Sequence, residues 1–272
     1  MPKPLPISKK FAAKELAHYL AVAKKAALAG GKVARKGFFA FDRGEVQYKK
    51  RFRELFSHQD QIVELAVRKE IIRHFPEHSI NGEEQKRREK NSDFVWQIDP
   101  IDGTVNFTIH DPNFNVSVAL QYKGQSIAAV LYSPIVDEMF WATPGGGAWL
   151  NSKRIKVSKM KKLSDSMLNM GWAHDDRQNG PAYKWFTKLK KQKIKVRSIG
   201  AASVHIVGVA CGRLDGNIQP QMAVWDVAAA QLIASEAGAR TTDRYGKPVK
   251  HYNDYVITTN GLIHDQLIKA LR

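Results

Sequence analysis

Two aspartates, Asp99 and Asp102, lie three residues apart in a stretch whose composition suits metal chemistry. The largely apolar residues 94–98 before them predict a buried strand, and Pro100 fixes one backbone angle between the two aspartates. Two carboxylates held this close repel each other unless a cation lies between them, and Mg²⁺ prefers a few carboxylates together with a substrate phosphate. The pair therefore predicts a site for a divalent cation at the end of a strand.

Gly103 and Thr104 follow at once and are suited to holding an anion. A turn or short helix can begin there, and the backbone N–H groups at a helix start attract negative charge. One loop would then hold a metal ion and a phosphate together. The same residues also fit a strand followed by an Asx turn, in which aspartate and glycine only shape the backbone.

The segment Asp-Pro-Ile-Asp-Gly-Thr-Val-Asn-Phe, residues 99–107, resembles the signature loop of the inositol monophosphatase family, whose members are metal-dependent and often lithium-sensitive phosphomonoesterases. Two further segments are similar to that family. They are Gly-Glu-Glu at residues 82–84, and Trp-Asp-Val-Ala-Ala at residues 225–229 followed by Glu-Ala-Gly at residues 236–238. The resemblance extends from about residue 12 to the C-terminus. It implies an α/β (α+β) fold, a layered α/β/α/β/α sandwich.

The resemblance also implies a role for each site residue. The metal ligands would be Glu83, Asp99, the backbone carbonyl of Ile101, Asp102 and Asp226. Roughly two or three Mg²⁺ ions would bind there, and a water molecule rather than a side chain would attack the phosphate.

The catalytic residues implied are Glu83, Thr104 and Asp60. Glu83 and Thr104 would hold the attacking water, and Asp60 would hydrogen-bond Thr104. The phosphate and substrate contacts implied are Asp102, Gly103, Thr104, Gly200, Ala201, Ala202, Gln219 and Asp226.

Plainer explanations exist for the carboxylates outside the signature loop. Asp60 follows Ser57 by three residues and precedes an apolar run, which is a helix-start signature, so it could be a capping residue alone. Asp226 could likewise cap the start of a helix, and that role can coexist with metal binding. Acidic pairs such as that at Glu83 are common after turns, and only the order and spacing of the three segments favour a metal ligand there.

The substrate stays open. Inositol-specific family members carry a glutamate where this chain has Gln219, and the family commonly has serine or threonine where this chain has Ala201. Trp172 stands where a small polar residue is usual. Inositol monophosphate, fructose-1,6-bisphosphate, nucleotide 3′-phosphates and other phosphate esters all remain candidates.

The pattern of elements predicts two halves that form one compact unit. Residues 1–149 would form an α+β half with an antiparallel sheet and the metal-binding loop, and residues 150–272 an α/β half. Residues 9–38 predict a long helix with a kink at Gly30 and Gly31. Residues 46–56 predict a strand or strand pair around a flexible loop, in which Lys49 falls where the family has a lysine and Glu54 where an aspartate is usual.

The composition fits a globular protein. The 272 residues are 43% apolar with a mean hydropathy of −0.38, and no apolar stretch approaches the roughly 20 residues that span a bilayer. The single cysteine, Cys211, lies in an apolar run and predicts a core residue in a reducing cytoplasm. The N-terminus lacks the apolar core of a secretion signal, and a cleaved organelle address stays open because the first 14 residues are basic and free of acids.

The formal net charge of +17 favours anionic partners. Runs of lysine and arginine are usually solvated faces, and no zinc finger, RNA-recognition motif or helix-turn-helix pattern accompanies them here. We therefore expect a cytoplasmic, Mg²⁺-dependent phosphomonoesterase that acts on a small phosphorylated substrate, forms a homodimer and does not bind membranes. The alternative is a basic RNA- or ribosome-associated regulatory protein that uses the same fold. A metal-free structural protein would leave the acidic residues without a counterion.

Overall fold

A computed structural model describes residues 11–42, 47–48, 55–56, 58–173, 175–249, 252 and 254–272. The predictions for Lys49, Glu54 and Ser57 lie outside these residues. The predicted strand pair in this region is confirmed, since β1 (Gln47–Tyr48) and β2 (Leu55–Phe56) pair in antiparallel orientation.

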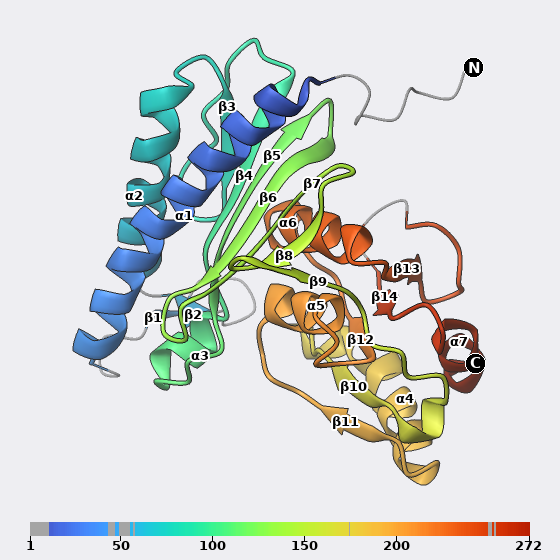
Figure 1. Ribbon diagram of the computed structural model, residues 1–272. Coiled ribbons are helices and arrows are strands. Elements are labelled where there is room, and N and C mark those ends of the chain that lie inside the picture. The colour runs from blue at the N-terminus through green and yellow to red at the C-terminus, as the bar shows by residue number, and fades with distance from the viewer. Residues whose placement is uncertain are drawn as a thin grey trace.

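Helices and sheets alternate in five layers (Figure 1). The long helices α1 (Ala13–Ala40) and α2 (His58–His74) cover one face of a seven-stranded sheet, and α5 (Ala202–Ala210) and α6 (Val224–Glu236) lie between that sheet and a five-stranded one. The remaining longer helices, α4 (Gly180–Lys191) and α7 (His264–Leu271), pack on the outer face of the second sheet. The predicted α/β/α/β/α sandwich is confirmed.

The first sheet has the order β3-β4-β5-β6-β7-β8-β9. Its strands are β3 (Ser79–Gly82), β4 (Phe94–Asp102), β5 (Asn115–Tyr122), β6 (Gln125–Ser133), β7 (Glu138–Thr143), β8 (Gly147–Leu150) and β9 (Lys153–Ile155). All neighbours are antiparallel except β3 and β4, which run parallel. The division expected between residues 149 and 150 falls inside β8, and the first sheet continues through β9.

The second sheet has the order β11-β10-β12-β14-β13. Its strands are β10 (Met167–Met170), β11 (Lys195–Arg197), β12 (Gly216–Gln219), β13 (Arg240–Asp243) and β14 (Val256–Thr259). β10 lies parallel to both β11 and β12, so these three strands end at the same edge of the sheet. Two single-turn 3₁₀ helices, η3 (Leu163–Asp165) and η4 (Asp176–Gln178), and the short helix α3 (Thr104–Thr108) complete the elements.

Three apolar clusters hold the layers together. The first lies between α1, α2 and the first sheet and includes Val67 and Trp96; the second surrounds α5 and α6 between the sheets. The third lies beneath α4 and α7 and includes Trp185 and Leu267. None of the described helices combines the length and apolar character that a bilayer crossing requires.

The two glycines of α1 allow close packing. The helix runs unbroken through Gly30 and Gly31, where we expected a kink. A Cβ atom on Gly30 would lie 2.6 Å from Cγ2 of Val67 on α2, and one on Gly31 would overlap the ring of Tyr132 on β6. These positions therefore need glycine because α1 is pressed against α2 and the sheet.

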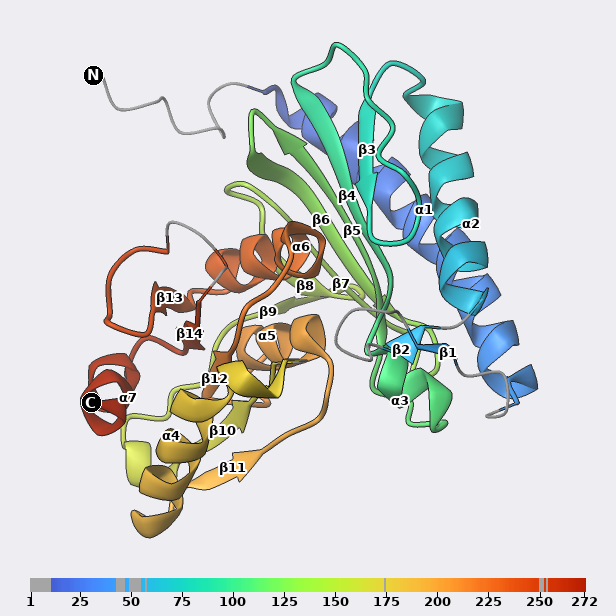
Figure 2. The same ribbon diagram turned by 180° about the vertical axis from the view of Figure 1, so that it is seen from behind.

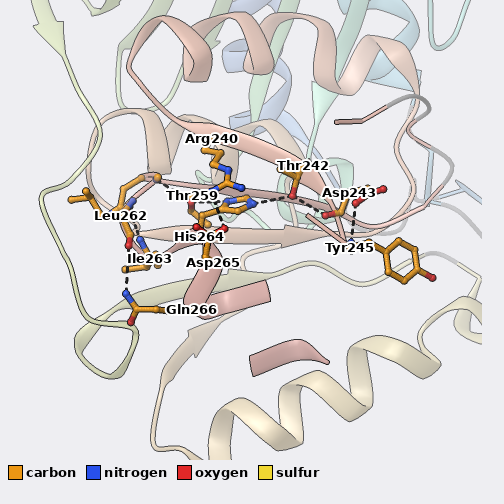
Figure 3. Close-up of polar contacts among 12 residues, drawn as sticks. Arg240, Thr242, Asp243, Tyr245, Thr259, Leu262, Ile263, His264, Asp265 and Gln266 are labelled. Carbon is orange, nitrogen blue, oxygen red and sulfur yellow. Dashed lines mark hydrogen bonds and ion pairs between the residues drawn. The ribbon is translucent and has the colours of Figure 1, made fainter. Parts of the chain in front are cut away.

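The start of α7 is held by a buried histidine (Figure 3). The ring nitrogens of His264 lie 2.9 Å from Oγ1 of Thr242 on β13 and 3.0 Å from Oγ1 of Thr259 on β14. Burial, and then the charge of Arg240, lower the pKa of His264 to about 4. The ring is therefore neutral in the folded protein at neutral pH.

This histidine should make the fold acid-sensitive. An unfolded histidine binds a proton below a pKa of about 6.5, whereas folded His264 resists protonation down to about 4, so folding stability falls as the pH drops through this window. His264→Gln should destabilise the protein at pH 7 by loss of hydrogen bonds, but by about 1–2 kcal/mol less at pH 5. Urea unfolding at both pH values measures this difference. A loss of stability from His264→Gln that is the same at both pH values would contradict the prediction.

Candidate active site

The buried strand β4 carries the two aspartates of the signature segment. It continues through Asp99 and Pro100 to Asp102, beyond the predicted end at Ile98, and its pairing with β5 shifts register between the two aspartates. Proline has no N–H to donate, and a shift of this kind re-aims side chains at the end of a strand. In both overall views β4 leads directly into α3 (Figures 1 and 2).

Gly103 makes the turn from β4 into α3. Its φ of +103° lies in the left-handed region, and a Cβ atom there would lie 2.9 Å from the Cβ of Ala201 at the start of α5. Conformation and close approach therefore both require glycine.

Three carboxylates from distant parts of the chain converge here. Glu83 follows β3, Asp99 lies on β4 and Asp226 lies in the first turn of α6. One carboxylate oxygen from each lies within 4.8 Å of the other two. Such a set of hard oxygen donors is the kind that binds Mg²⁺ or a similar divalent cation.

Asp99 shows the electrostatic cost of this cluster. Its side chain is 2% exposed. Burial raises the pKa of Asp99 well above its usual value, and the charges of Glu83, Asp102, Asp226 and Asp60 raise it further. The Asx turn is present as well, because the N–H of Ile101 donates to Oδ1 of Asp99 at 3.1 Å. Backbone shaping and a position in the acidic cluster thus coexist in one residue.

Asp102 connects the end of β4 to the start of α5. Its Oδ1 accepts a hydrogen bond from the N–H of Ala202 at 3.0 Å, and its Oδ2 accepts from the N–H of Ser203 at 2.7 Å and from the Ser203 hydroxyl. Burial raises the pKa of Asp102, and these hydrogen bonds oppose the rise. Asp102 therefore lies beside the three converging carboxylates with both oxygens directed at α5. A carboxylate has lone pairs enough to bind a cation in addition.

Thr104 contacts two of the expected residues. Its Oγ1 lies 3.2 Å from Oδ1 of Asp60 and 3.2 Å from the carbonyl oxygen of Ile101. Asp60 lies in the first turn of α2 and is 3% exposed, so a helix from one layer reaches the loop at the end of β4.

Asp226 also shapes the start of its helix. The N–H of Ala223 donates to its Oδ2 at 2.8 Å, which fixes the carboxylate at the beginning of α6. The two roles that the sequence allowed, a helix-start acceptor and a member of the acidic cluster, are therefore both present in the geometry.

The other residues that we expected to bind the substrate lie at the edge of the second sheet where β10, β11 and β12 end. Gly200, Ala201 and Ala202 lead from β11 into α5 next to Gly103 and Asp102. Gln219, at the end of β12, turns instead toward Gly171, where a Cβ atom would lie 2.5 Å from its amide. Its buried Oε1 has no hydrogen-bond partner among the described residues. The described contacts of Gln219 are thus not with the carboxylate cluster.

Two residues that the sequence did not single out also build the site. The Ser203 hydroxyl binds Asp102. Nδ2 of Asn106 donates to the carbonyls of Asn113 and Ile199, each at 2.7 Å, which connects α3 to the segment that follows β11. Asn106 lies within the signature segment, which is the signal that marks it. Ser203 is the first side chain with a hydrogen-bonding group after the small residues that open α5.

Comparison with known proteins identifies the relatives of this arrangement. The model of the inositol monophosphatase family matches residues 15–272. A Thermotoga maritima protein named fructose-1,6-bisphosphatase/inositol-1-monophosphatase is 32% identical over 226 residues, which cover 83% of this chain and 86% of that protein. A Xylella fastidiosa protein named Nus factor SuhB is 35% identical over 231 residues, which cover 85% of this chain and 83% of that protein.

A solved structure shows the same fold. The inositol monophosphatase from Anabaena (Nostoc) sp. PCC 7120 has a TM-score of 0.82 and 35% sequence identity, and the match covers 94% of this chain and 96% of that chain. The matched family region contains all three segments that carry the converging carboxylates. The chain therefore belongs to the inositol monophosphatase family and is a phosphoric monoester hydrolase.

Proposed function

We propose that this protein hydrolyses a small phosphate monoester with the help of Mg²⁺ bound by Glu83, Asp99 and Asp226. The observation that carries the proposal is the convergence of these carboxylates to within 4.8 Å, with Asp99 buried among them. Without a cation, the repulsion that Glu83 and Asp226 exert on the buried Asp99 is costly, because little water reaches Asp99 to screen it. The carboxylate of Asp102 and the carbonyl of Ile101 complete the proposed ligand set.

The side chains around the cluster would orient the reactants. Mg²⁺ bound there would bring positive charge to a phosphate group and make water more acidic. Because the Thr104 hydroxyl can donate to Asp60, its oxygen lone pairs are free to accept from a water molecule. Glu83 would accept a proton from that water, and the N–H groups of Gly103 and Thr104 would hold phosphate oxygens.

The proposed substrate is inositol monophosphate or a related sugar or nucleotide phosphate. The Gln219 amide can hydrogen-bond hydroxyl groups but carries no charge, and Trp172 adds a ring that is 37% exposed at the end of β10. Phosphate release from a panel of inositol, fructose and nucleotide phosphates ranks the candidates.

We also propose a cytoplasmic homodimer, as the family resemblance implies. One face of the molecule has a cavity of about 600 Å³, lined in part by the apolar residues Phe140, Val207 and the exposed Val136. We propose that a second copy of the chain binds at this face. Light scattering on the purified chain measures the mass in solution, and a monomer at micromolar concentration would contradict the proposal.

Loss of one cluster carboxylate should remove catalysis and leave the fold intact. Asp99→Asn and Asp226→Asn should each lower Mg²⁺-dependent phosphate release by more than about 100-fold. Substitution of a residue that only orients a metal ligand typically costs about 10–100-fold, and loss of a ligand itself should cost more. Asp93→Asn is the matched control, because Asp93 precedes the other end of β4 and pairs with Lys123 on the surface. A cluster variant with near wild-type turnover would contradict the assignment.

Thermal unfolding should report metal binding without any substrate. Mg²⁺ at 100 times its dissociation constant should stabilise the wild type by about 2.7 kcal/mol. Asp99→Asn should be at least as stable as the wild type in EDTA, because the substitution relieves the repulsion that Asp99 experiences. It should gain little from added Mg²⁺. If neither EDTA nor Mg²⁺ changes the melting temperature of the wild type, this would argue against a metal centre.

A second function, binding of single-stranded nucleic acid, is proposed for the surface formed by α4 and β11. Residues 177–214 contain no aspartate or glutamate. Seven exposed cations on this segment form no ion pair with a described residue; they are Lys184, Lys188, Lys190, Lys191, Lys193, Lys195 and Arg197. Beside them Trp172 contacts Tyr183 and Phe186, with ring centroids 5.2 and 6.2 Å apart. Exposed rings next to positively charged side chains favour the binding of stacked bases and phosphates.

Fluorescence anisotropy with a labelled single-stranded RNA tests this surface. Replacing Lys184, Lys188 and Lys191 with glutamine should weaken binding and reduce its dependence on salt. Phosphatase activity should not change. The control replaces the exposed Lys14, Lys25 and Lys32 of α1 with glutamine. Equal binding by both triple variants would contradict the proposal. The lysines would then be solvated side chains that keep the edge strand β11 from pairing with other chains.

A further inference from the structure

A stripe of three charged side chains lies on the buried face of α2. Asp60, Glu64 and Arg68 are spaced four residues apart, so they lie one above another along the helix. They are 3%, 0% and 8% exposed. Asp60 binds Thr104, whereas neither Glu64 nor Arg68 has a part in the proposed reaction.

Glu64 binds the backbone of the two residues that follow Glu83. Its Oε2 accepts from the N–H of Glu84 at 2.7 Å, and its Oε1 accepts from the N–H of Gln85 at 3.2 Å. The side chain thus fixes the loop on the C-terminal side of Glu83 from a helix in another layer.

Arg68 binds both Glu64 and the same loop. Its Nε donates to Oε1 of Glu64 at 2.6 Å, and a second guanidinium nitrogen donates to the carbonyl of Gln85 at 3.2 Å. One planar side chain therefore neutralises Glu64 and holds the same loop. An unpaired carboxylate at Glu64 would instead be a buried charge near an acidic cluster, which is costly.

The N-terminal side of Glu83 is fixed as well. The N–H of Glu83 donates to the carbonyl of Ile98 at 3.2 Å, next to Asp99 on β4. At Gly82 a Cβ atom would overlap the Glu64 carboxylate, so the chain passes directly over that group. Glu83 is therefore bracketed between β4 and the Glu64–Arg68 pair.

We infer that Glu64 and Arg68 are a positioning pair that holds the Glu83 carboxylate in place for metal binding. This inference rests on the proposed function, in which Glu83 is a metal ligand. Neither residue belongs to the carboxylate cluster of Glu83, Asp99 and Asp226. The Glu64 carboxylate is paired with Arg68 and faces the backbone of Glu84 and Gln85.

The test is Glu64→Gln, which keeps the shape but replaces one acceptor oxygen with a donor that faces other donors. Mn²⁺ binding followed by electron paramagnetic resonance, and phosphate release against Mg²⁺ concentration, both report on the site. We expect an apparent metal constant about 10–100-fold weaker, with kcat at saturating Mg²⁺ within about threefold of the wild type. Glu70→Gln is the matched control, since it lies on the same helix and its carboxylate faces His74 at 3.1 Å; it should leave the metal constant unchanged.

A second variant covers a failure of Glu64→Gln to fold. Arg68→Lys keeps the charge, but a single ammonium group cannot reproduce the fork that binds Glu64 and Gln85, so we expect the same weakening in milder form. Loss of thermal stability with an unchanged metal constant would overturn the inference and leave the pair with a purely structural role. A wild-type protein that binds no Mn²⁺ would instead overturn the proposed metal centre, and the two failures are therefore distinguishable.

Discussion

Repulsion among the carboxylates that crowd around the buried Asp99 is the constraint on which this structure depends. Asp99 is enclosed by protein, and burial together with the charges of four neighbouring acids opposes its ionisation. Left alone, these side chains would swing apart or take up protons. The geometry persists because the acidic side chains, or the backbone beside them, are tied to elements that pack into apolar clusters. Much of the architecture therefore serves to hold like charges together in the space where a cation is expected.

The hydrogen bonds that hold the acidic residues involve helices of two layers, α2 on the outer face of the first sheet and α5 and α6 between the sheets. Asp102 is held by the start of α5, Asp226 by the backbone at the start of α6, and the loop of Glu83 by α2. Each tie uses a backbone N–H, whose position is fixed by the helix or loop to which it belongs. Backbone donors are harder to displace by substitution than side chains. This arrangement makes the acidic cluster depend on the docking of helices against sheets rather than on a flexible loop.

The layered fold and most of the converging residues could be predicted because short segments of the sequence resemble those of the inositol monophosphatase family, and the resemblance implies both. The run from Asp99 to Phe107 and the Trp-Asp pair at Asp226 are recognisable from their residue types alone. The sequence could not predict the strands β9 and β13, since Lys-Arg-Ile and Arg-Thr-Thr-Asp carry almost no alternation of apolar and polar residues. The role of Glu64 could not be predicted either. A glutamate in a charged helix is usually exposed to solvent, and only the structure shows that Glu64 binds the backbone of Glu84 and Gln85.

The position of Asp102 links the proposed substrate side to the proposed metal side. The edge where β10, β11 and β12 end carries the residues that would meet the leaving group, whereas Glu83 and Asp99 belong to the first sheet. Asp102 and Asn106 bind across this junction, to α5 and to the carbonyl of Ile199, and Asn115 of β5 also donates to Ser203 of α5. A displacement of α5 or of the segment after β11 would therefore act directly on the end of β4 and on α3. Substrate preference and metal binding should consequently not evolve independently in this fold, because Asp102 connects the end of β4 to the start of α5.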